Sequence, residues 1–241
     1  MMEIDVVRLG AVVLALTAVG AVIAYVGRLG VARQIVTASL RAAVQLAAVS
    51  AIIVVVLRHG LLTAAFIGLM YAVATLTSAR RLTGAWSRWW IPAAAIATGV
   101  APVLTLLLAT GLVPLSGIAV VPIAGILIGG AMTATSLAGR RALDELRTRH
   151  GEYEAGLAIG LMRRDAALEI ARPTAATALM PALDQTRTVG LVTLPGAFVG
   201  VLLGGASPVQ AGAIQLLVLI GLLAVETAAT IVTTEAICST S

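Results

Sequence analysis

The sequence predicts an all-α polytopic membrane protein of about seven transmembrane helices, with its N-terminus outside the cell and its C-terminus in the cytoplasm. Of the 241 residues, 60% are apolar and only 11% are charged, whereas about a quarter of the residues in a soluble domain are charged. Long apolar runs alternate with short segments that hold most of the arginines. This composition excludes a soluble globular protein, and an aromatic content of 3% argues against nucleic acid as a partner.

Seven apolar runs are candidates for membrane-spanning helices, each of which needs about 20 mainly apolar residues. The runs cover residues 9–26, 35–57, 61–78, 91–111, 118–138, 189–204 and 209–232. The sixth run is short, so we expect its helix to begin earlier, near Leu183. The first run has an n-region of mixed charge and no convincing cleavage site, which favours a spanning helix over a signal peptide. We expect residues 1–241 to form one membrane domain.

The placement of the arginines predicts the orientation, because positively charged loops stay in the cytoplasm. Twelve arginines fall in the segments assigned to one side, and two, Arg8 and Arg58, fall on the other. This asymmetry predicts a multi-pass protein of the cell (inner or plasma) membrane, surrounded by the lipid bilayer.

A cytoplasmic segment of about 139–175, between the fifth and sixth spans, is the longest polar part of the chain. It is rich in Ala, Leu, Glu and Arg, which favours helix. Its residues include Glu154, Ala155, Gly160, Ile170 and Pro173. At this spacing they resemble the EAA loop of ABC-importer permeases, from which Gly156 and Arg172 depart.

The pattern in this segment predicts a short helix, a break at glycine, and a second helical stretch that ends near the proline. The resemblance implies that the segment couples the permease to a cytoplasmic ATPase. An ordinary surface helix is the alternative interpretation.

A second resemblance is carried by Val121–Met132 and Asp184–Gly196, and Gly204–Pro208 and Gln215 extend it to about residues 33–232. These stretches are similar to FetB-like permeases, a family associated with iron export and aluminium resistance. The resemblance implies the permease subunit of an ATP-driven exporter of a metal ion such as iron, or of a non-metal solute such as a sugar nucleotide. Gly130 stands where the family has Asn, and Ala197, Phe198 and Val199 replace Met-Met-Thr. Soft thioether ligands are therefore lost, and the metal-binding residues stay unknown.

The chain contains no lysine, so it cannot hold a P-loop, whose lysine contacts the β and γ phosphates of the nucleotide. We therefore expect this chain to bind no cofactor of its own, while a separate cytoplasmic ABC ATPase subunit uses ATP and Mg²⁺. The resemblance further implies two ATPase copies and a second copy of the permease.

Two charged residues lie inside the predicted spans, where an ionisable side chain is costly and therefore a candidate for function. Arg41 and Glu226 each lie about 9 Å inside the predicted cytoplasmic boundary, at 1.5 Å per residue. We hypothesise that they pair at an inner gate, with Gln45 one turn beyond Arg41. In the alternative, Arg41 extends to the interface and Glu226 faces a wet cavity.

Polar and helix-breaking residues also mark the sixth span as part of a translocation path. Asp184 and Arg187 are expected near its cytoplasmic mouth, where they would contact substrate or orient the helix, and Pro195–Gly196 is expected to kink it. No His or Cys lies within a span, so no catalytic constellation is predicted and the chain is not expected to be an enzyme. A stand-alone secondary transporter and a membrane scaffold are the alternative functions.

Overall fold

A computed structural model describes residues 5–84 and 88–240, and their secondary structure is helical apart from one isolated bridge between Val189 and Thr193. Six of the described helices are long and apolar enough to cross a membrane. The protein is therefore an all-α, multi-pass membrane protein, as predicted. The chain divides into two compact units, residues 1–58 and 59–241, and each is described by itself.

Unit 1 is a hairpin of two helices, α1 (Val6–Val26) and α2 (Ala32–Arg58). The Asp5 side chain caps α1 by accepting hydrogen bonds from the amides of Val7 and Arg8. The turn between the helices uses two residues with positive φ, Arg28 at 53° and Gly30 at 72°. Most apolar side chains of both helices are exposed in this unit, as expected where lipid covers them.

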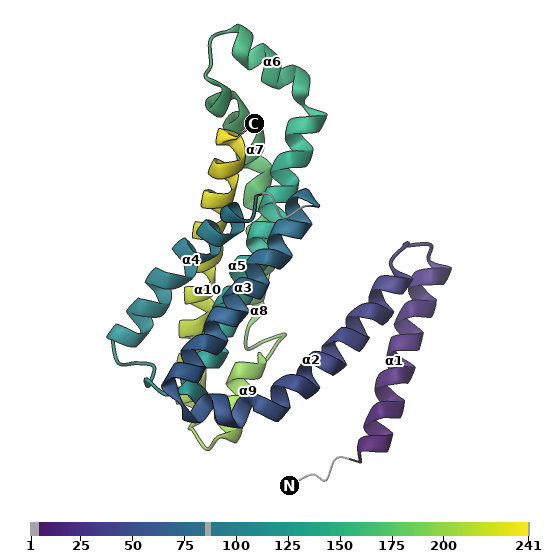
Figure 1. Ribbon diagram of the computed structural model, residues 1–241, viewed down its shortest axis with the longest axis vertical. Helices are drawn as coiled ribbons and strands as arrows, with labels where there is room; N and C mark the ends of the chain where they lie inside the picture. The colour runs from purple at the N-terminus through teal and green to yellow at the C-terminus, as the bar shows by residue number, and fades with distance from the viewer. Residues whose placement is uncertain (1–4, 85–87, 241) are drawn as a thin grey trace. The chain divides into compact units, whose positions relative to one another are not determined.

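Unit 2 contains four long helices: α3 (Gly60–Thr83), α4 (Trp90–Ala109), α5 (Gly117–Thr148) and α10 (Pro208–Ser239). Shorter elements lie between α5 and α10. They are α6 (His150–Ala158), α7 (Arg163–Ala175), the 3₁₀ turn η1 (Ala176–Leu179), α8 (Met180–Thr188) and α9 (Gly196–Leu203). Figure 1 shows α6 at one end of this unit and α9 at the other, and we refer to the α6 end and the α9 end.

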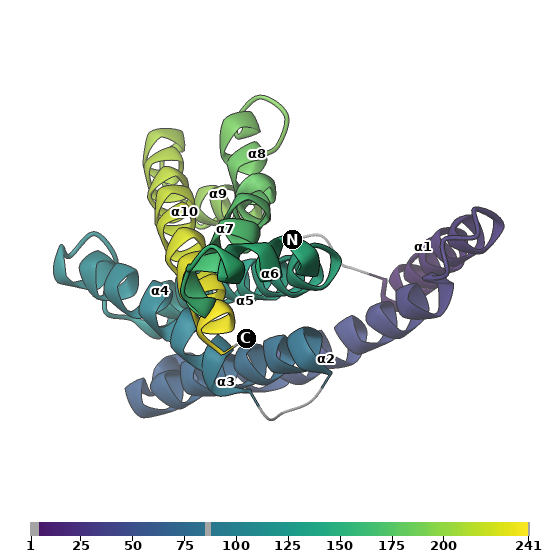
Figure 2. The same cartoon turned by 90° about the horizontal axis from the view of Figure 1, so that it is seen from above.

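The residues that meet at the α6 end give the directions of the four long helices in unit 2. Close to the α6 end, a Cβ added to Gly139 of α5 would contact Leu82 of α3 and Ile237 of α10. Since these residues come late in their helices, α3, α5 and α10 all run toward the α6 end. The first turn of α4 lies at the same end, because Ile91 shares a cluster of buried side chains with Ile237. Helix α4 is therefore antiparallel to the other three (Figures 1 and 2).

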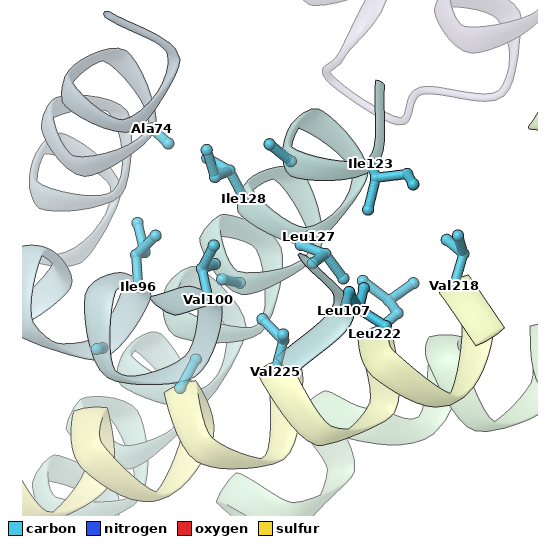
Figure 3. Packing of buried hydrophobic residues seen from close by; sticks show 14 of the residues in the cluster. Ala74, Ile96, Val100, Leu107, Ile123, Leu127, Ile128, Val218, Leu222 and Val225 are labelled. Carbon is cyan, nitrogen blue, oxygen red and sulfur yellow. The ribbon is translucent and has the colours of Figure 1, made fainter. Parts of the chain in front are cut away.

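The main apolar core lies between α4, α5 and α10, with α3 at its margin. Figure 3 shows side chains of this cluster on three helices: Ile96 and Val100 of α4, Leu127 of α5 and Val225 of α10. Helices approach closely at small residues, as is usual in membranes. At Gly99, for example, an added Cβ would lie 2.7 Å from the carbonyl oxygen of Val225. Small residues thus let the α4 and α10 backbones come into contact.

Hydroxyl groups add polar links within this bundle. Ser78 of α3 and Ser136 of α5 hydrogen-bond each other at 3.1 Å, and both side chains are buried. The Tyr71 hydroxyl of α3 donates to the carbonyl oxygen of Ala93 in α4, at 2.8 Å. These bonds join α3 to α4 and α5 and oppose sliding of α3 along these two helices.

The sixth crossing differs from the prediction, which placed one continuous helix from about Leu183 to residue 204. Arg172 of α7 bonds Glu235 near the end of α10, whereas α9 and the early α10 residue Ile214 line one cavity. The chain therefore crosses unit 2 between α7 and α9, but it does so in pieces. The helix stops at Thr188, and Gly190 has a φ of 83°, which L residues rarely adopt. Pro195 then precedes the first residue of α9.

Candidate functional site: the α6 end and the broken sixth crossing

Helix α6 projects from the α6 end as an exposed nine-residue helix, and it carries the predicted coupling residues Glu154 and Ala155. None of its residues is buried in the described structure. Glu154 Oε1 lies 3.5 Å from Nδ1 of His150, one turn earlier, and both side chains are more than half exposed. At the start of α6, a hydrogen bond from Arg149 lowers the pKa of the Glu152 carboxyl. The helix therefore presents an accessible outer face, which includes Glu154 and Ala155, to a partner.

Glycines allow the sharp return from α6 to α7. Gly160 has a φ of 93°, and its amide donates to the carbonyl of Leu157 at 3.0 Å, which closes the last turn of α6. The predicted break at Gly160 is thus present. Gly156 faces α7, where an added Cβ would lie 3.2 Å from the Cβ of Ala166. The close packing of α6 on α7 gives a physical reason for glycine at position 156.

Helix α7 packs into the bundle through one face. Ile170 is buried, as are Leu168 and Ala171. The second helical stretch ends near the proline, as predicted: Pro173 lies in the last turn of α7, which ends at Ala175 and leads into η1. A tighter 3₁₀ turn follows and keeps the chain helical. Pro173 has no backbone N–H, so the helix lacks the hydrogen bond that another residue would donate there.

Two arginines of α7 bind one carboxylate of α10. Nη2 of Arg164 donates to Oε2 of Glu235 at 2.5 Å, and Nη2 of Arg172 donates to Oε1 at 3.1 Å. Two such charge-assisted bonds hold the carboxylate more firmly than one would. We call these three residues the α7–α10 clamp. It joins the segment that follows α6 to the last turns of α10, one of the two longest membrane-spanning helices described in unit 2.

Glu226 lies near the middle of α10, about two turns before Glu235 of the clamp. Its side chain is buried, with only 7% exposed. Its Oε1 atom packs on α5, because a Cβ added to Gly130 would lie 2.7 Å from it. Thr230, one turn later on α10, is also buried, and its hydroxyl has no hydrogen-bond partner within the described part of the chain. A carboxylate and a free hydroxyl thus share one face inside the bundle.

Asp184 and Arg187 lie deeper than predicted. Residues of α7 and η1 line a cavity with Thr227–Glu235 of α10, and residues 189–198 line another with Gly212–Leu219. Helix α8 is therefore beside the middle of α10, and not at the mouth of a sixth helix. Arg187 bonds Asp184 at 3.4 Å, and both side chains are about two-thirds exposed. Charges at this depth require a protein or water surface next to them, because lipid cannot solvate them.

Pro195 and Gly196 lie at the junction of a loop with α9, and not within one kinked helix. Pro195 is the N-cap of α9 and has an extended conformation, with ψ of 150°. The structure therefore replaces the predicted kink with a complete break of the helix over residues 189–195.

Arg41 and Gln45 are exposed, one turn apart on α2 of unit 1. Glu226 belongs to unit 2, so the predicted pairing of Arg41 with Glu226 stays a prediction. Among the described residues, no group of three or more His, Cys, Asp or Glu side chains is arranged to hold a metal ion.

Comparison with known proteins assigns the chain to a family. A family model described as "Uncharacterised protein family (UPF0014)" matches residues 7–241. The chain belongs to the UPF0014 family. It is 30% identical to the UPF0014 membrane protein STAR2 of Oryza sativa subsp. japonica over 224 residues, which covers 91% of this chain and 78% of that protein. No solved structure matches the chain.

A second UPF0014 relative carries a transport name. The chain is 32% identical over 142 residues to the probable iron export permease protein FetB of Escherichia coli (strain K12), covering 57% of this chain and 53% of that protein. The UPF0014 membrane protein YjkA of Bacillus subtilis (strain 168) is 31% identical over 191 residues, with 78% and 76% covered. The predicted resemblance to FetB-like proteins is confirmed, and relatives are named as permeases or membrane proteins and not as enzymes.

Sequence reasoning missed two residues of this UPF0014 protein that the structure brings forward. Glu235 was not a candidate, although Arg172 departs from the EAA-loop pattern and its guanidinium needs a partner. Gln215 was noted only for its similarity to the family, and the structure buries its amide beside the broken crossing. The surroundings of both side chains come from segments far apart in the chain, so a local sequence pattern does not reveal them.

Proposed function

We propose that this protein is the permease subunit of an ATP-driven ABC transporter, energised by a separate cytoplasmic ATPase that docks on α6. The observation that carries the proposal is the exposed α6, with Glu154 and Ala155 accessible and Gly160 ending the helix, at the end of unit 2 where α3, α5 and α10 finish. A docking helix must be accessible to its partner and yet connected to the bundle. The α7–α10 clamp supplies that connection.

The proposed transport unit contains two copies of this permease and two ATPase subunits. The polar face of α8 supports a second copy, because Asp184 and Arg187 are exposed at mid-depth and need a protein or water neighbour. A path between two permeases would place Asp184 and Arg187 along the route of the substrate. Glu226, Arg41 and Gln45 stay predicted residues of a gate. The proposed cargo is a metal ion such as iron, moved outward, since a relative is named as an iron export permease.

Co-purification with the ATPase tests the docking step. The permease and its ATPase are expressed together, and the complex is isolated through a tag on the ATPase. Replacing Glu154 with Arg should abolish recovery of the permease, whereas replacing Glu169, an exposed residue of α7, should leave it unchanged. Recovery of the Glu154 variant at the normal level would refute docking on α6.

Flux in vesicles tests transport itself. Vesicles that contain both subunits should move ⁵⁵Fe only with ATP, and vesicles with the permease alone should not. Transport by the permease alone would favour a secondary transporter. Stimulation of the ATPase by a panel of metal ions and sugar nucleotides would then identify the cargo class.

A further inference from the structure

Asp184 and Arg187 form a charged pair on one face of α8 whose hydrogen-bonding capacity is largely unused. Nη1 of Arg187 contacts Oδ1 of Asp184 at 3.4 Å. Among the described residues, Oδ2 of Asp184 and the other N–H groups of the guanidinium have no partner. A carboxylate has two acceptor oxygens and a guanidinium has several donors. The exposed side of the pair can therefore bind a second acid and a second base.

The depth of this pair restricts what can cover it. Helix α8 lies beside the middle of α10, which is long and apolar enough to cross a membrane. Charged side chains at such a depth face protein or water, because lipid cannot solvate them. The exposed face of α8 is therefore not a surface for lipid alone.

The loop that follows α8 gives independent evidence about the same surface. The carbonyl oxygens of Gly190, Leu191 and Val192 accept no hydrogen bond from the described residues, and the side chains of Leu191 and Val192 are highly exposed. Non-helical backbone at membrane depth is tolerated only where it is buried in protein or lines a water-filled cavity. The loop and the α8 face thus both need a neighbour other than lipid.

We propose that the α8 face is covered by α8 of a second copy of this chain, and that Asp184 and Arg187 of the two copies form one shared ring of four charges. The inference rests on the proposed function, which includes a second permease, and it names the surface and the residues that join the two copies. Each copy contributes one acid and one arginine, so the site is incomplete in a single chain.

The chemistry of the pair fits a symmetric partner. Two copies with the same orientation in a membrane are related by a twofold axis along the membrane normal, which brings identical residues to the same depth. Two Asp184 carboxylates alone would repel each other, but Arg187 already reaches back to the carboxylate of its own chain. Each guanidinium can then contact both carboxylates. The face carries one charge of each sign, so it matches its own copy and not an anionic lipid headgroup.

Exchange of the charges between two copies tests this ring. Two differently tagged copies are co-expressed, and the amount of one that is recovered with the other is measured. When both copies carry Asp184→Arg, or both carry Arg187→Asp, association should fall by about tenfold or more, because like charges that face each other across an interface oppose binding. When one copy carries Asp184→Arg and the other Arg187→Asp, the ring is neutral again and recovery should return to the wild-type level.

The same exchange at Asp5 and Arg8 is the matched control. These residues form an exposed acid–arginine pair with the same spacing of three residues at the start of α1. All combinations of Asp5→Arg and Arg8→Asp should associate like the wild type. Equal recovery in all three combinations at Asp184 and Arg187 would overturn the shared ring.

A cysteine cross-link tests the contact without changing the charges. In a Cys238→Ser background, which removes the single native cysteine, Met180→Cys places a thiol on the exposed side of α8 one turn before the acid. A short bis-maleimide should convert most of this variant in native membranes into a covalent dimer. Thr98→Cys is the control, because Thr98 is exposed on α4 and its neighbour Gly99 packs on Val225 near the middle of α10. It should stay monomeric.

The cross-link decides the question even where a charge variant does not fold. Covalent dimers at Met180→Cys but not at Thr98→Cys support the α8 interface, whereas equal yields at the two positions, or no dimer at either, would overturn it and leave water or another molecule next to α8. Neither experiment measures ATP hydrolysis or transport. An α8 dimer without ATP-driven flux would refute only the proposed function, and ATP-driven flux without an α8 contact would refute only this interface.

Discussion

Arg172 donates a hydrogen bond to Glu235 at 3.1 Å and thereby links α7, which follows the exposed α6, to the final turns of α10. Glu235 also binds Arg164, which lies two turns earlier on α7. A force applied to α6 would pass through this clamp into the helix that carries Glu226. The residue that departs from the EAA-loop pattern, Arg172, is thus part of the link between α7 and α10.

We expect Glu235→Gln to uncouple ATP hydrolysis from transport. The amide keeps the shape but loses the charge that holds two guanidinium groups, so transport should fall by about 2- to 30-fold, the range for residues that carry coupling between sites. ATPase activity of the complex should persist. Stability should fall by about 1 kcal/mol or less, since these ion pairs are partly exposed.

The control for this variant is Glu169→Gln, at an exposed residue of α7. Transport and ATPase activity are measured in the same vesicles, so that their ratio reports coupling. An unchanged ratio in Glu235→Gln would show that the clamp is only structural.

Local patterns in the sequence predicted much of this structure. Apolar runs located the long helices, and the spacing of Glu154 and Gly160 predicted a short helix that ends at a glycine. The break in the sixth crossing was missed because apolar residues such as Leu191 and Val192 continue through it. Backbone hydrogen bonds cause that break: the carbonyl of Thr188 accepts from Val192 at 2.9 Å, and Gly190 donates to Thr193 at 2.9 Å.

The depth of Asp184 was missed for a related reason. Counting residues from an expected helix start assumes a straight helix that begins at the membrane surface. In the structure, α7 and η1 already occupy the α6 end, which moves α8 to the middle of α10. Contacts between distant segments, such as that of Gly130 with Glu226, cannot be obtained from periodicity in one segment.

Gly160→Ala should weaken docking of the ATPase. Its φ of 93° places an alanine in a region that costs about 1 kcal/mol or more for L residues, and relief of that strain would reorient α6. Gly151→Ala is the matched control, because Gly151 lies within α6 with open space around it and alanine favours helix. Affinity for the ATPase, measured by surface plasmon resonance, should fall for the first variant only; equal affinities would argue against a positioning role for Gly160.

Gly130→Ala should disturb Glu226 and destabilise the bundle. The new Cβ would lie 2.7 Å from Oε1 of Glu226 and would also overlap the Leu222 side chain, and overpacking of this kind costs about 1–3 kcal/mol. Gly129→Ala, at the neighbouring residue with no atom within 4 Å of an added Cβ, should be neutral. Thermal unfolding in detergent compares the two variants, and similar midpoints would contradict the packing described for α5 and α10.

The start of α6 should respond to acid through Glu152. A hydrogen bond from Arg149 lowers the pKa of this carboxyl below its usual value of 4.5. A lowered pKa means that the ionised form stabilises the folded helix, so the contribution is complete at neutral pH and is lost as the pH falls from 4.5 toward the lowered value. Carboxyl titration by NMR should give a higher pKa for Glu152 in Arg149→Gln than in the wild type. The reverse order would exclude the ion pair in solution.

Charge reversal tests the predicted pairing of Arg41 with Glu226. If the two side chains neutralise each other at an inner gate, Arg41→Glu and Glu226→Arg should each abolish transport, because each leaves two like charges in a site of low polarity. The double reversal restores one positive and one negative charge and should recover a substantial part of the flux. Gln45→Glu, one turn from Arg41 on α2, controls for the mere addition of an acid to this helix. Two inactive single variants combined with an inactive double variant would leave Arg41 at the membrane interface and Glu226 facing a wet cavity, in which case the carboxylate would act on the substrate without a partner arginine.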